Sequence, residues 1–327
     1  MNFAEFQIHR ERLLRERRGL LDCSVTNLYA TLARFIPPVS EIPAARVHRC
    51  HLASEWVERF GFVADASRRA LISCGVRDSL GLLFRHYAGR GAHVWLPSDN
   101  YPVYADLATE TGVTFSEFPT LPSPAWPSAE VAAQDELLLI TNPMKPLGRW
   151  LSPGDVAALT AWLSAKPSRR LLLDAVYTFA MRFHPTTLQL LATGQAILLH
   201  SLTKGWLQPR LFGIALVPEL DTPALTPVFR GAPPPQDHLA RARELMSRHQ
   251  EVPGAIVREL ELGCARLLAA LPSDLPLAAH GNAPGYFQIV AQPWQELLEQ
   301  TNILGLPASV FGSCEEITVL SSLAFIA

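Results

Sequence analysis

Five short apolar runs, separated by helix-like stretches, fill the middle of the sequence between residues 54 and 217. They read HVWLP, ELLLIT, RRLLLDA, AILLHSL and LFGIALV, at residues 93–97, 136–141, 169–175, 196–202 and 211–217. Strands of a parallel sheet are covered by helices on both faces, so they are apolar almost throughout, whereas strands with one wet face alternate. The pattern therefore predicts an α/β domain with a mostly parallel sheet between helices.

The stretches between these runs have the composition of amphipathic helices. Examples are RDSLGLLFRHYAG at residues 77–89 and PGDVAALTAWLSA at residues 153–165. The second begins with helix-start signals, because Ser152 can cap, Pro153 suits the first helical position and Asp155 faces the positive end of the helix dipole. A helix is therefore predicted from about residue 153.

Three prolines in GAPPPQD, residues 231–237, interrupt this alternation, since proline cannot continue a helix or a central strand. The rest of the chain has two helical segments and two strand-like runs, at residues 238–250, 255–271, 286–292 and 316–327. We predict a large α/β domain over residues 47–230 and a smaller α+β domain made of residues 1–46 and 231–327.

Composition excludes several classes of protein. A formal net charge of -2 gives no electrostatic reason for a nucleic-acid partner. The start, MNFAEFQIHR, lacks the apolar core of a signal peptide, and we see no continuous apolar stretch long enough to span a membrane. The five cysteines are scattered without CxxC spacing, which indicates neither disulfides nor a zinc site. We therefore expect a cytoplasmic protein with no metal site and no membrane partner.

Candidate chemistry lies just past the ends of three apolar runs, in LLLDAVYTF, HSLTKGW and ITNPMKPLG, residues 171–179, 200–206 and 140–148. Asp174 follows three leucines, and burying it is costly unless it meets a cation or a hydrogen-bond donor; a helix cap is the plainer alternative. Lys204 follows Ser201 and Thr203, which suits a phosphate beside an amine, although such groupings at strand ends are common. Taken alone, the third segment is a turn.

In their order and spacing, these segments resemble the class I/II aminotransferases of fold type I, which depend on pyridoxal 5′-phosphate (PLP), and most of all the histidinol-phosphate aminotransferase group. The family's Asn-Pro-x-Asn-Pro-Thr-Gly, Asp-x-x-Tyr and Ser-x-Ser/Thr-Lys appear as NPMKPLG (142–148), DAVY (174–177) and SLTK (201–204). Flanking similarities are SCGVRD (73–78), PSDNYPVY (97–104) and LPASVFG (306–312). The resemblance covers nearly the whole chain and implies the family's two-domain α/β fold.

The resemblance also implies a role for individual residues. Lys204 would bind PLP as an aldimine and then move a proton, Asp174 would pair with the pyridinium nitrogen, and Tyr177 would bond the phenolic oxygen. The phosphate would be held by the amides of Gly75, Val76 and Arg77 together with Ser201, Thr203 and Arg210. The remaining implied cofactor contacts come from Tyr101 or Tyr104, stacked on the ring, from Asn142 and Lys145 in the Asn-Pro loop, and from Tyr29. Tyr29 would reach the neighbouring subunit of a homodimer with shared active sites.

Several residues depart from the family pattern. Lys145 replaces the second asparagine; it either lies beside the phenolic oxygen and lowers the aldimine pKa, or points to solvent in a rebuilt loop. The phosphate arginine, expected eight residues after the lysine, is replaced by Phe212, and Arg210 lies six after it. Leu147 replaces the threonine of the loop.

The C-terminal arginine that binds the substrate carboxylate in this family is also missing. Leu320 or Ser321 stands at its position in EITVLSSLAFIA. Three arginines elsewhere could substitute for it, namely Arg149, Arg182 or Arg230.

Three functions remain open at this point. The first is an aminotransferase acting on a small amino compound. The second is a PLP-dependent lyase or decarboxylase of a specialised pathway, which the missing carboxylate arginine favours. The third is a non-catalytic relative, which the joint retention of Asp174, Tyr177 and Lys204 argues against. The sequence has no GxGxxG after a strand, no P-loop, no HExxH and no GxSxG.

Overall fold

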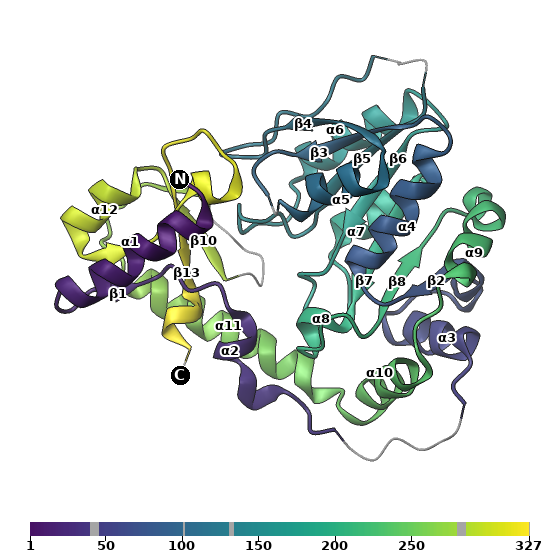
Figure 1. Cartoon of the computed structure of the whole chain (residues 1–327), viewed down its shortest axis with the longest axis horizontal. Coiled ribbons are helices and arrows are strands. Elements are labelled where there is room, and N and C mark those ends of the chain that lie inside the picture. The colour runs from purple at the N-terminus through teal and green to yellow at the C-terminus, as the bar shows by residue number, and fades with distance from the viewer. Residues whose placement is uncertain (40–45, 101, 131–133, 280–285, 327) are drawn as a thin grey trace.

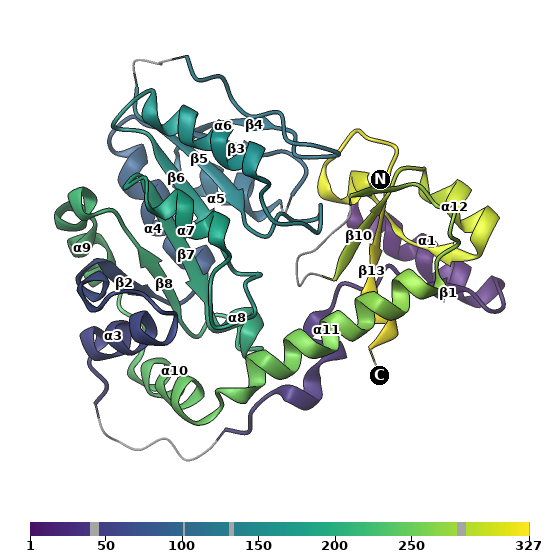
Figure 2. The ribbon, with the colours of Figure 1, turned by 180° about the vertical axis from the view of Figure 1, so that it is seen from behind.

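The computed structural model describes residues 1–39, 46–100, 102–130, 134–279 and 286–326. They form a large lobe and a small lobe, and the long helix α11 (Glu251–Ala270) runs from one to the other (Figures 1 and 2). Among the described residues, no helix is long and apolar enough to cross a membrane.

The large lobe is built on a seven-stranded sheet in the order β2-β8-β7-β6-β5-β3-β4. Every neighbouring pair is parallel except those of β8, which is antiparallel to both β2 and β7. The strands are β2 (Ala70–Ser73), β3 (His93–Pro97), β4 (Thr114–Phe118), β5 (Glu136–Thr141), β6 (Arg170–Asp174), β7 (Ala196–Ser201) and β8 (Gly213–Leu216). All five apolar runs are strands, so the prediction of a mostly parallel α/β sheet is confirmed.

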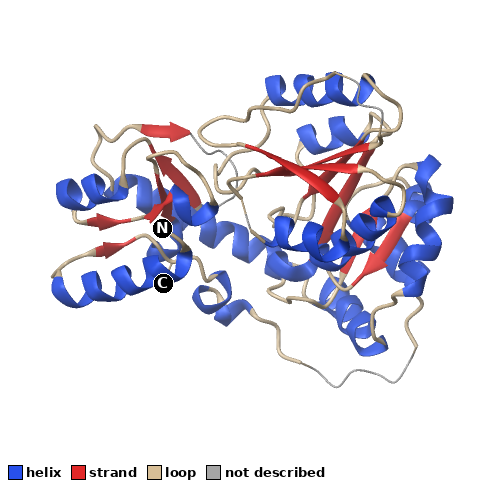
Figure 3. Cartoon of the chain, turned by 45° about the horizontal axis from the view of Figure 1, so that its top comes forward, coloured by secondary structure: helices blue, strands red, loops and turns tan. Residues whose placement is uncertain are grey.

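Helices cover both faces of this sheet (Figure 3). Alternate strand residues point to opposite faces; Leu137 and Leu139 join one apolar core, and Leu138 and Ile140 join the other. The first core contains residues of α4 (Val76–Ala88), α5 (Val103–Thr111) and α9 (Thr222–Gly231). The second contains residues of α3 (Arg49–Arg59), α6 (Pro153–Ser164), α7 (Pro185–Leu191) and α10 (Gln236–Arg248).

The helix predicted from residue 153 is α6, and the capping bonds at its start explain why it begins there. The Ser152 hydroxyl accepts a hydrogen bond from the Asp155 amide (3.1 Å), and the Asp155 carboxylate accepts one from the Ser152 amide (2.8 Å). This reciprocal capping satisfies donors that the first helical turn leaves unpaired.

The small lobe contains a four-stranded antiparallel sheet in the order β12-β13-β10-β9 and a parallel pair, β1 and β11. The strands are β1 (Leu21–Asp22), β9 (Leu277–Ala279), β10 (Phe287–Val290), β11 (Ile303–Leu304), β12 (Leu306–Pro307) and β13 (Thr318–Ser321). The remaining helices are α1 (Phe3–Glu16), α2 (Leu28–Thr31), α8 (Leu202–Gly205) and α12 (Trp294–Thr301), of which α8 belongs to the large lobe. Short 3-10 turns are η1 (Ala33–Phe35), η2 (Ala64–Arg69), η3 (Glu219–Asp221), η4 (Ala308–Phe311) and η5 (Ser322–Phe325).

Helix α10 differs from the predicted division of the chain. The boundary at residue 231 assigns it to the small domain, yet it lies with α3 beside the large sheet (Figure 1). Arg243 of α10 forms an ion pair with Glu55 of α3 (3.0 Å). The proline-rich segment therefore ends α9 without ending the large lobe, and the crossing to the small lobe occurs along α11. The predicted domain boundaries stay predictions.

Candidate active site

The carboxyl ends of strands β2, β6 and β7 meet at one edge of the large sheet. Gly213 of β8 pairs in register with Ser73 at the end of β2 and with Ser201 at the end of β7. Asp174 ends β6 and pairs with Leu199, two residues before Ser201. Functional side chains of open α/β sheets gather at this edge, and the structure places three of the predicted segments there.

Asp174 is buried, with 3% of its surface exposed. Its Oδ1 accepts a hydrogen bond from the Val176 amide (2.9 Å) and its Oδ2 accepts one from the Tyr104 hydroxyl (2.7 Å). Burial raises the pKa of Asp174, and these two bonds together with the charges of Lys145 and Lys204 oppose the rise. The carboxyl group is thus held in a fixed orientation at the base of the site.

Tyr104 therefore contacts the aspartate, a contact that the sequence did not indicate. Ring stacking was implied for Tyr101 or Tyr104, and Tyr101 lies outside the described residues. The phenol of Tyr104 comes from α5 and is buried.

Lys204 lies in the short helix α8, which starts directly after β7. Burial, and then the charge of Lys145, lower the pKa of Lys204 to about 8, against the opposite effect of Asp174. The Lys204 Nζ lies 5.2 Å from the ring centroid of Tyr177 and 5.1 Å from that of Tyr29. A lysine with a lowered pKa carries more of the neutral, nucleophilic amine near pH 7.

Tyr29 contributes to the site of its own chain. Its hydroxyl donates a hydrogen bond to the Thr203 carbonyl oxygen (3.3 Å), and its ring lies under the Lys204 ammonium group. The resemblance implies that Tyr29 reaches a neighbouring subunit, and within this single chain the structure instead brings it against Lys204. A shared site in a homodimer stays a prediction.

A backbone cradle lies beside these side chains at the start of α4. Gly75 precedes the helix with φ of 143°, and no side chain caps the helix there. A Cβ atom on Gly213 would lie 2.5 Å from the Gly75 Cα, so Gly213 must be glycine for the two segments to approach this closely, whereas Gly75 needs glycine for its backbone angle. Amides at a helix N-terminus are suited to hold a phosphate. Arg77 can offer only its amide, because its guanidinium group lies 3.7 Å from Glu110 at the surface.

Of the other predicted phosphate ligands, some lie next to Lys204 and one is exposed. The Ser201 hydroxyl, at the start of α8, accepts a hydrogen bond from the Thr203 amide (3.3 Å), so both residues lie next to Lys204. Arg210 is exposed, with a left-handed backbone (φ 58°), and Phe212 is fully buried in the core. A phosphate contact from Arg210 stays a prediction.

Asn142 anchors the loop that follows β5. Its side-chain amide donates to the hydroxyls of Thr187 (2.8 Å) and Thr186 (3.2 Å), and its oxygen accepts from the Leu151 amide (3.1 Å). These bonds tie the loop to α7 and give Asn142 a role in shaping it. A direct contact between Asn142 and a cofactor stays a prediction.

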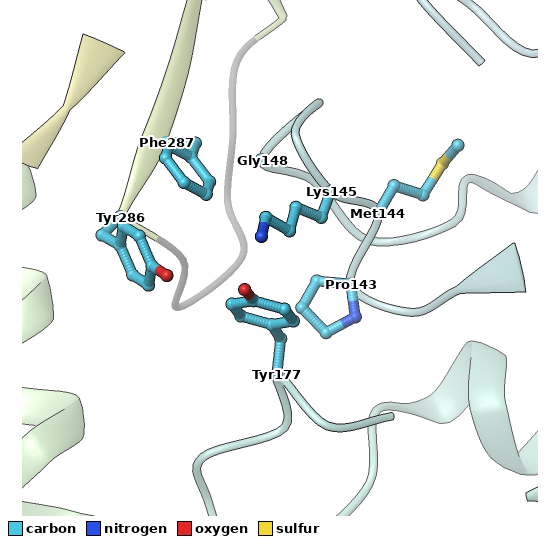
Figure 4. A pocket seen from close by; sticks show the side chains of 7 residues that line it. All are labelled: Pro143, Met144, Lys145, Gly148, Tyr177, Tyr286 and Phe287. Carbon is cyan, nitrogen blue, oxygen red and sulfur yellow. The ribbon is translucent and has the colours of Figure 1, made fainter. Parts of the chain in front are cut away.

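Lys145, from the same loop, points into a small pocket between the two lobes (Figure 4). Its Nζ lies 5.0 Å from the Tyr177 ring centroid and 5.6 Å from that of Phe287. Lys145 thus points toward Tyr177 and Phe287, and its predicted contact with the phenolic oxygen of the cofactor stays a prediction. The pocket is lined by Pro143, Met144, Lys145, Gly148, Tyr177, Tyr286 and Phe287.

The position of the family's carboxylate arginine is apolar in this chain. Leu320 is fully buried in a core cluster, and the buried Ser321 uses its hydroxyl to accept from the Leu323 amide. None of the three arginines proposed as substitutes is placed for that role. Arg149 is paired with the Asp155 carboxylate (2.7 Å), and Arg182 and Arg230 are exposed.

Two residues near the site belong to the core. The His200 Nδ1 accepts from the Trp56 indole (3.2 Å), and burial lowers the pKa of His200 to about 4, so the ring is neutral. Trp206 is buried and donates to the His249 carbonyl oxygen (2.9 Å). Within the part of the chain that the structure describes, no cluster of His, Cys, Asp or Glu could hold a metal ion.

A family model described as aminotransferase class I and II matches residues 46–219, which is more than half of the chain. The chain belongs to this family. The resemblance proposed from the sequence motifs is thereby confirmed, and the family depends on PLP.

Individual members of the family are similar to this chain over different extents. The histidinol-phosphate aminotransferase of Paramagnetospirillum magneticum is 35% identical over 123 residues, which cover 37% of this chain and 32% of that relative. The matched region thus spans about a third of the relative's length.

Solved aminotransferase structures share the fold over almost the whole chain. An aminotransferase from Mycobacterium tuberculosis has a TM-score of 0.70 at 16% identity, covering 98% of this chain and 91% of that one. A double mutant of Thermus thermophilus aspartate aminotransferase has a TM-score of 0.65 at 17% identity, with the same coverage. These similarities establish a fold type I aminotransferase structure, as predicted. They do not identify the substrate of this chain.

Proposed function

We propose that this protein is a PLP-dependent aminotransferase that acts on a small amino compound through Lys204. The observation that carries the proposal is the arrangement of Asp174, at the end of β6, and Lys204, in the helix that directly follows the neighbouring strand β7. A buried carboxyl group and an amine with a pKa of about 8 face the same site, beside a glycine cradle at a helix N-terminus. The fold itself does not require this combination, because burying a carboxylate and partly burying an amine both cost free energy.

The described residues fit PLP in its three chemical parts. The N-terminus of α4 and the turn at Gly75 suit the phosphate, Asp174 suits the pyridinium nitrogen, and the Tyr177 hydroxyl suits the phenolic oxygen. When bound, the cofactor supplies an electron sink for a carbanion at the substrate α-carbon.

The chain's own residues account for the proton chemistry around that carbon. With a pKa of about 8, roughly a tenth of Lys204 is neutral at pH 7, against fewer than one in a thousand for an ordinary lysine. Lys204 can therefore act both as a nucleophile and as a general base without a second catalytic group. The bonds from Tyr104 and Val176 hold Asp174 in place while the proton moves.

A lyase or decarboxylase on the same scaffold is the second candidate, because the arginine position of the family is occupied by Leu320 and Ser321. Both reactions need Lys204 and Asp174, so these residues do not separate them. The fate of the amino group does.

The test begins with the cofactor. Protein mixed with PLP is reduced with borohydride, and the modified lysine is identified by peptide mass spectrometry. The chain has three lysines, Lys145, Lys166 and Lys204, so the assignment is unambiguous. We expect the label on Lys204, its loss in Lys204→Ala and its retention in Lys166→Ala. Absence of a label on Lys204 would refute the proposal and favour a non-catalytic relative.

The second step separates the two catalytic candidates. The loaded protein is mixed with a panel of amino acids and amines, and the cofactor is recovered and analysed. Formation of pyridoxamine phosphate with a keto product supports transamination. Release of carbon dioxide or ammonia without pyridoxamine phosphate supports the lyase instead.

A further inference from the structure

The pocket that contains Lys145 lies where the large lobe contacts the small lobe directly. A Cβ atom on Gly148 would lie 2.3 Å from the Phe287 carbonyl oxygen, so the loop backbone packs against β10 with no room for a side chain. Lys145 comes from the large lobe, and the aromatic rings of Tyr286 and Phe287 come from the small lobe (Figure 4). The pocket is therefore formed by both lobes.

The loop holds the Lys145 backbone in a fixed position. The Lys145 amide donates to the Thr141 hydroxyl (3.0 Å), the Met144 amide to the Arg149 carbonyl oxygen (2.7 Å), and the Gly148 amide to the Met144 carbonyl oxygen (2.9 Å). These bonds on either side of Lys145 restrict where its side chain can reach. Its ammonium group lies against aromatic faces, which attract cations and exclude water.

Phe287 links Lys145 to the strand on which the family carries its arginine. In the small-lobe sheet, Ser321 pairs in register with Phe287, and Leu320 pairs with Gln288. Directly paired residues of antiparallel strands lie about 5 Å apart. The Lys145 Nζ lies 5.6 Å from the ring centroid of Phe287, the residue paired with Ser321, so its positive charge lies on the side of the pocket that β10 forms.

Two lysines bring positive charge to the pocket and its surroundings. Two of the three lysines of the chain, Lys145 and Lys204, lie about 5 Å from the Tyr177 ring centroid. The charges of both lysines act on the Asp174 carboxylate. Among the described residues that line the pocket, Lys145 is the one cation. A site of this kind favours an anionic group on the ligand.

We propose that Lys145 binds the carboxylate of the substrate, in place of the arginine that the family carries on the strand here called β13. This inference rests on the proposed function, since it concerns the substrate of the same site. The substrate class is then an amino compound with a carboxylate, held by a single ammonium group between aromatic rings. A lysine offers a point charge without the two-pronged geometry of a guanidinium group, so small changes in carboxylate position are tolerated.

The test measures carboxylate binding without relying on turnover. Butyrate and its neutral counterpart butyramide are titrated into the PLP-loaded protein, and the dissociation constants are taken from ligand-observed NMR. We expect Lys145→Met to weaken butyrate binding about tenfold or more, because a charge-assisted bond is lost, and to leave butyramide unchanged. Lys145→Arg should keep the dissociation constant for butyrate within a few-fold of that of the parent protein. Lys166→Met, which removes a lysine outside the site, is the matched control.

Two outcomes would overturn the inference. One is unchanged butyrate affinity in Lys145→Met, and the other is an equal loss for butyrate and butyramide, which would indicate lost packing. Lys145→Gln replaces Lys145→Met if the latter does not fold by circular dichroism. The same titration on cofactor-free protein separates the two proposals. If Lys204 takes no cofactor, the proposed function fails, but the titration still measures whether butyrate binding depends on the charge of Lys145.

Discussion

Replacing Lys145 by methionine should raise the pKa of Lys204, because it removes a like charge from the same site. The magnitude follows from the geometry. Each Nζ lies about 5 Å from the Tyr177 ring centroid, so the two ammonium groups are at most about 10 Å apart. At that distance and an effective dielectric constant of about 20, two unit charges repel by roughly 1.7 kcal/mol, or slightly more than one pKa unit. The pKa of Lys204, about 8 in the parent, should therefore rise to about 9.

Competitive labelling of the cofactor-free protein with trace acetic anhydride measures this pKa directly. Acylation of each lysine is followed by mass spectrometry from pH 6 to 11, and the chain yields three lysine peptides. Lys166 follows α6, and its Nζ donates to the Gln134 carbonyl oxygen (2.6 Å), so Lys166→Met should leave Lys204 unchanged. A Lys204 pKa that stays constant or falls in Lys145→Met would refute the electrostatic reasoning.

Three further predictions concern the base of the site, the lobe contact and the core. Tyr104→Phe removes a donor from Asp174, so the pKa of Asp174 should rise further and PLP affinity, measured by titration, should fall about tenfold; unchanged affinity would contradict this. Gly148→Ala should lower the free energy of unfolding, measured by thermal unfolding, by about 2 kcal/mol or more, because φ of Gly148 is 70° and the new Cβ would meet a carbonyl oxygen of β10. In the control Gly154→Ala the new Cβ has room, so the free energy of unfolding should hardly change. Burial lowers the pKa of His200 to about 4, so unfolding takes up a proton between pH 6.5 and 4. The free energy of unfolding should therefore fall by up to about 3 kcal/mol as the pH is lowered through that window. In His200→Gln this pH dependence, measured by denaturant titration, should be weaker.

The sequence could predict the large sheet because each of its central strands is buried on both faces and therefore reads as a continuous apolar run. The same reasoning predicted that Asp174 and Lys204 lie at the carboxyl edge of the sheet, where the structure has them, and their roles stay predictions. The capped start of α6 was predictable because the capping bonds join residues three apart.

Contacts between distant segments were not predictable in this way. Tyr104 and Asp174 are 70 residues apart, and the turn of α5 that directs the phenol at the carboxylate leaves no local signal. The packing of α10 beside α3 was not predictable because an apolar stripe shows that a helix packs, but not against which partner. The contact between Tyr29 and Lys204 was equally unpredictable, because it depends on the long-range approach of the N-terminal segment to α8.

The position of Lys145 has a consequence for how the two lobes cooperate. An arginine on β13 would make carboxylate binding depend on the placement of the small lobe relative to Lys204. Lys145 instead belongs to the same lobe as Lys204 and Asp174, on a loop fixed to β5 and α7. If Lys145 binds the carboxylate, then anion binding and amine chemistry share one rigid unit, and the small lobe contributes the aromatic cover of Tyr286 and Phe287. Changes to these rings should then affect how well water is excluded more than how well a carboxylate is recognised.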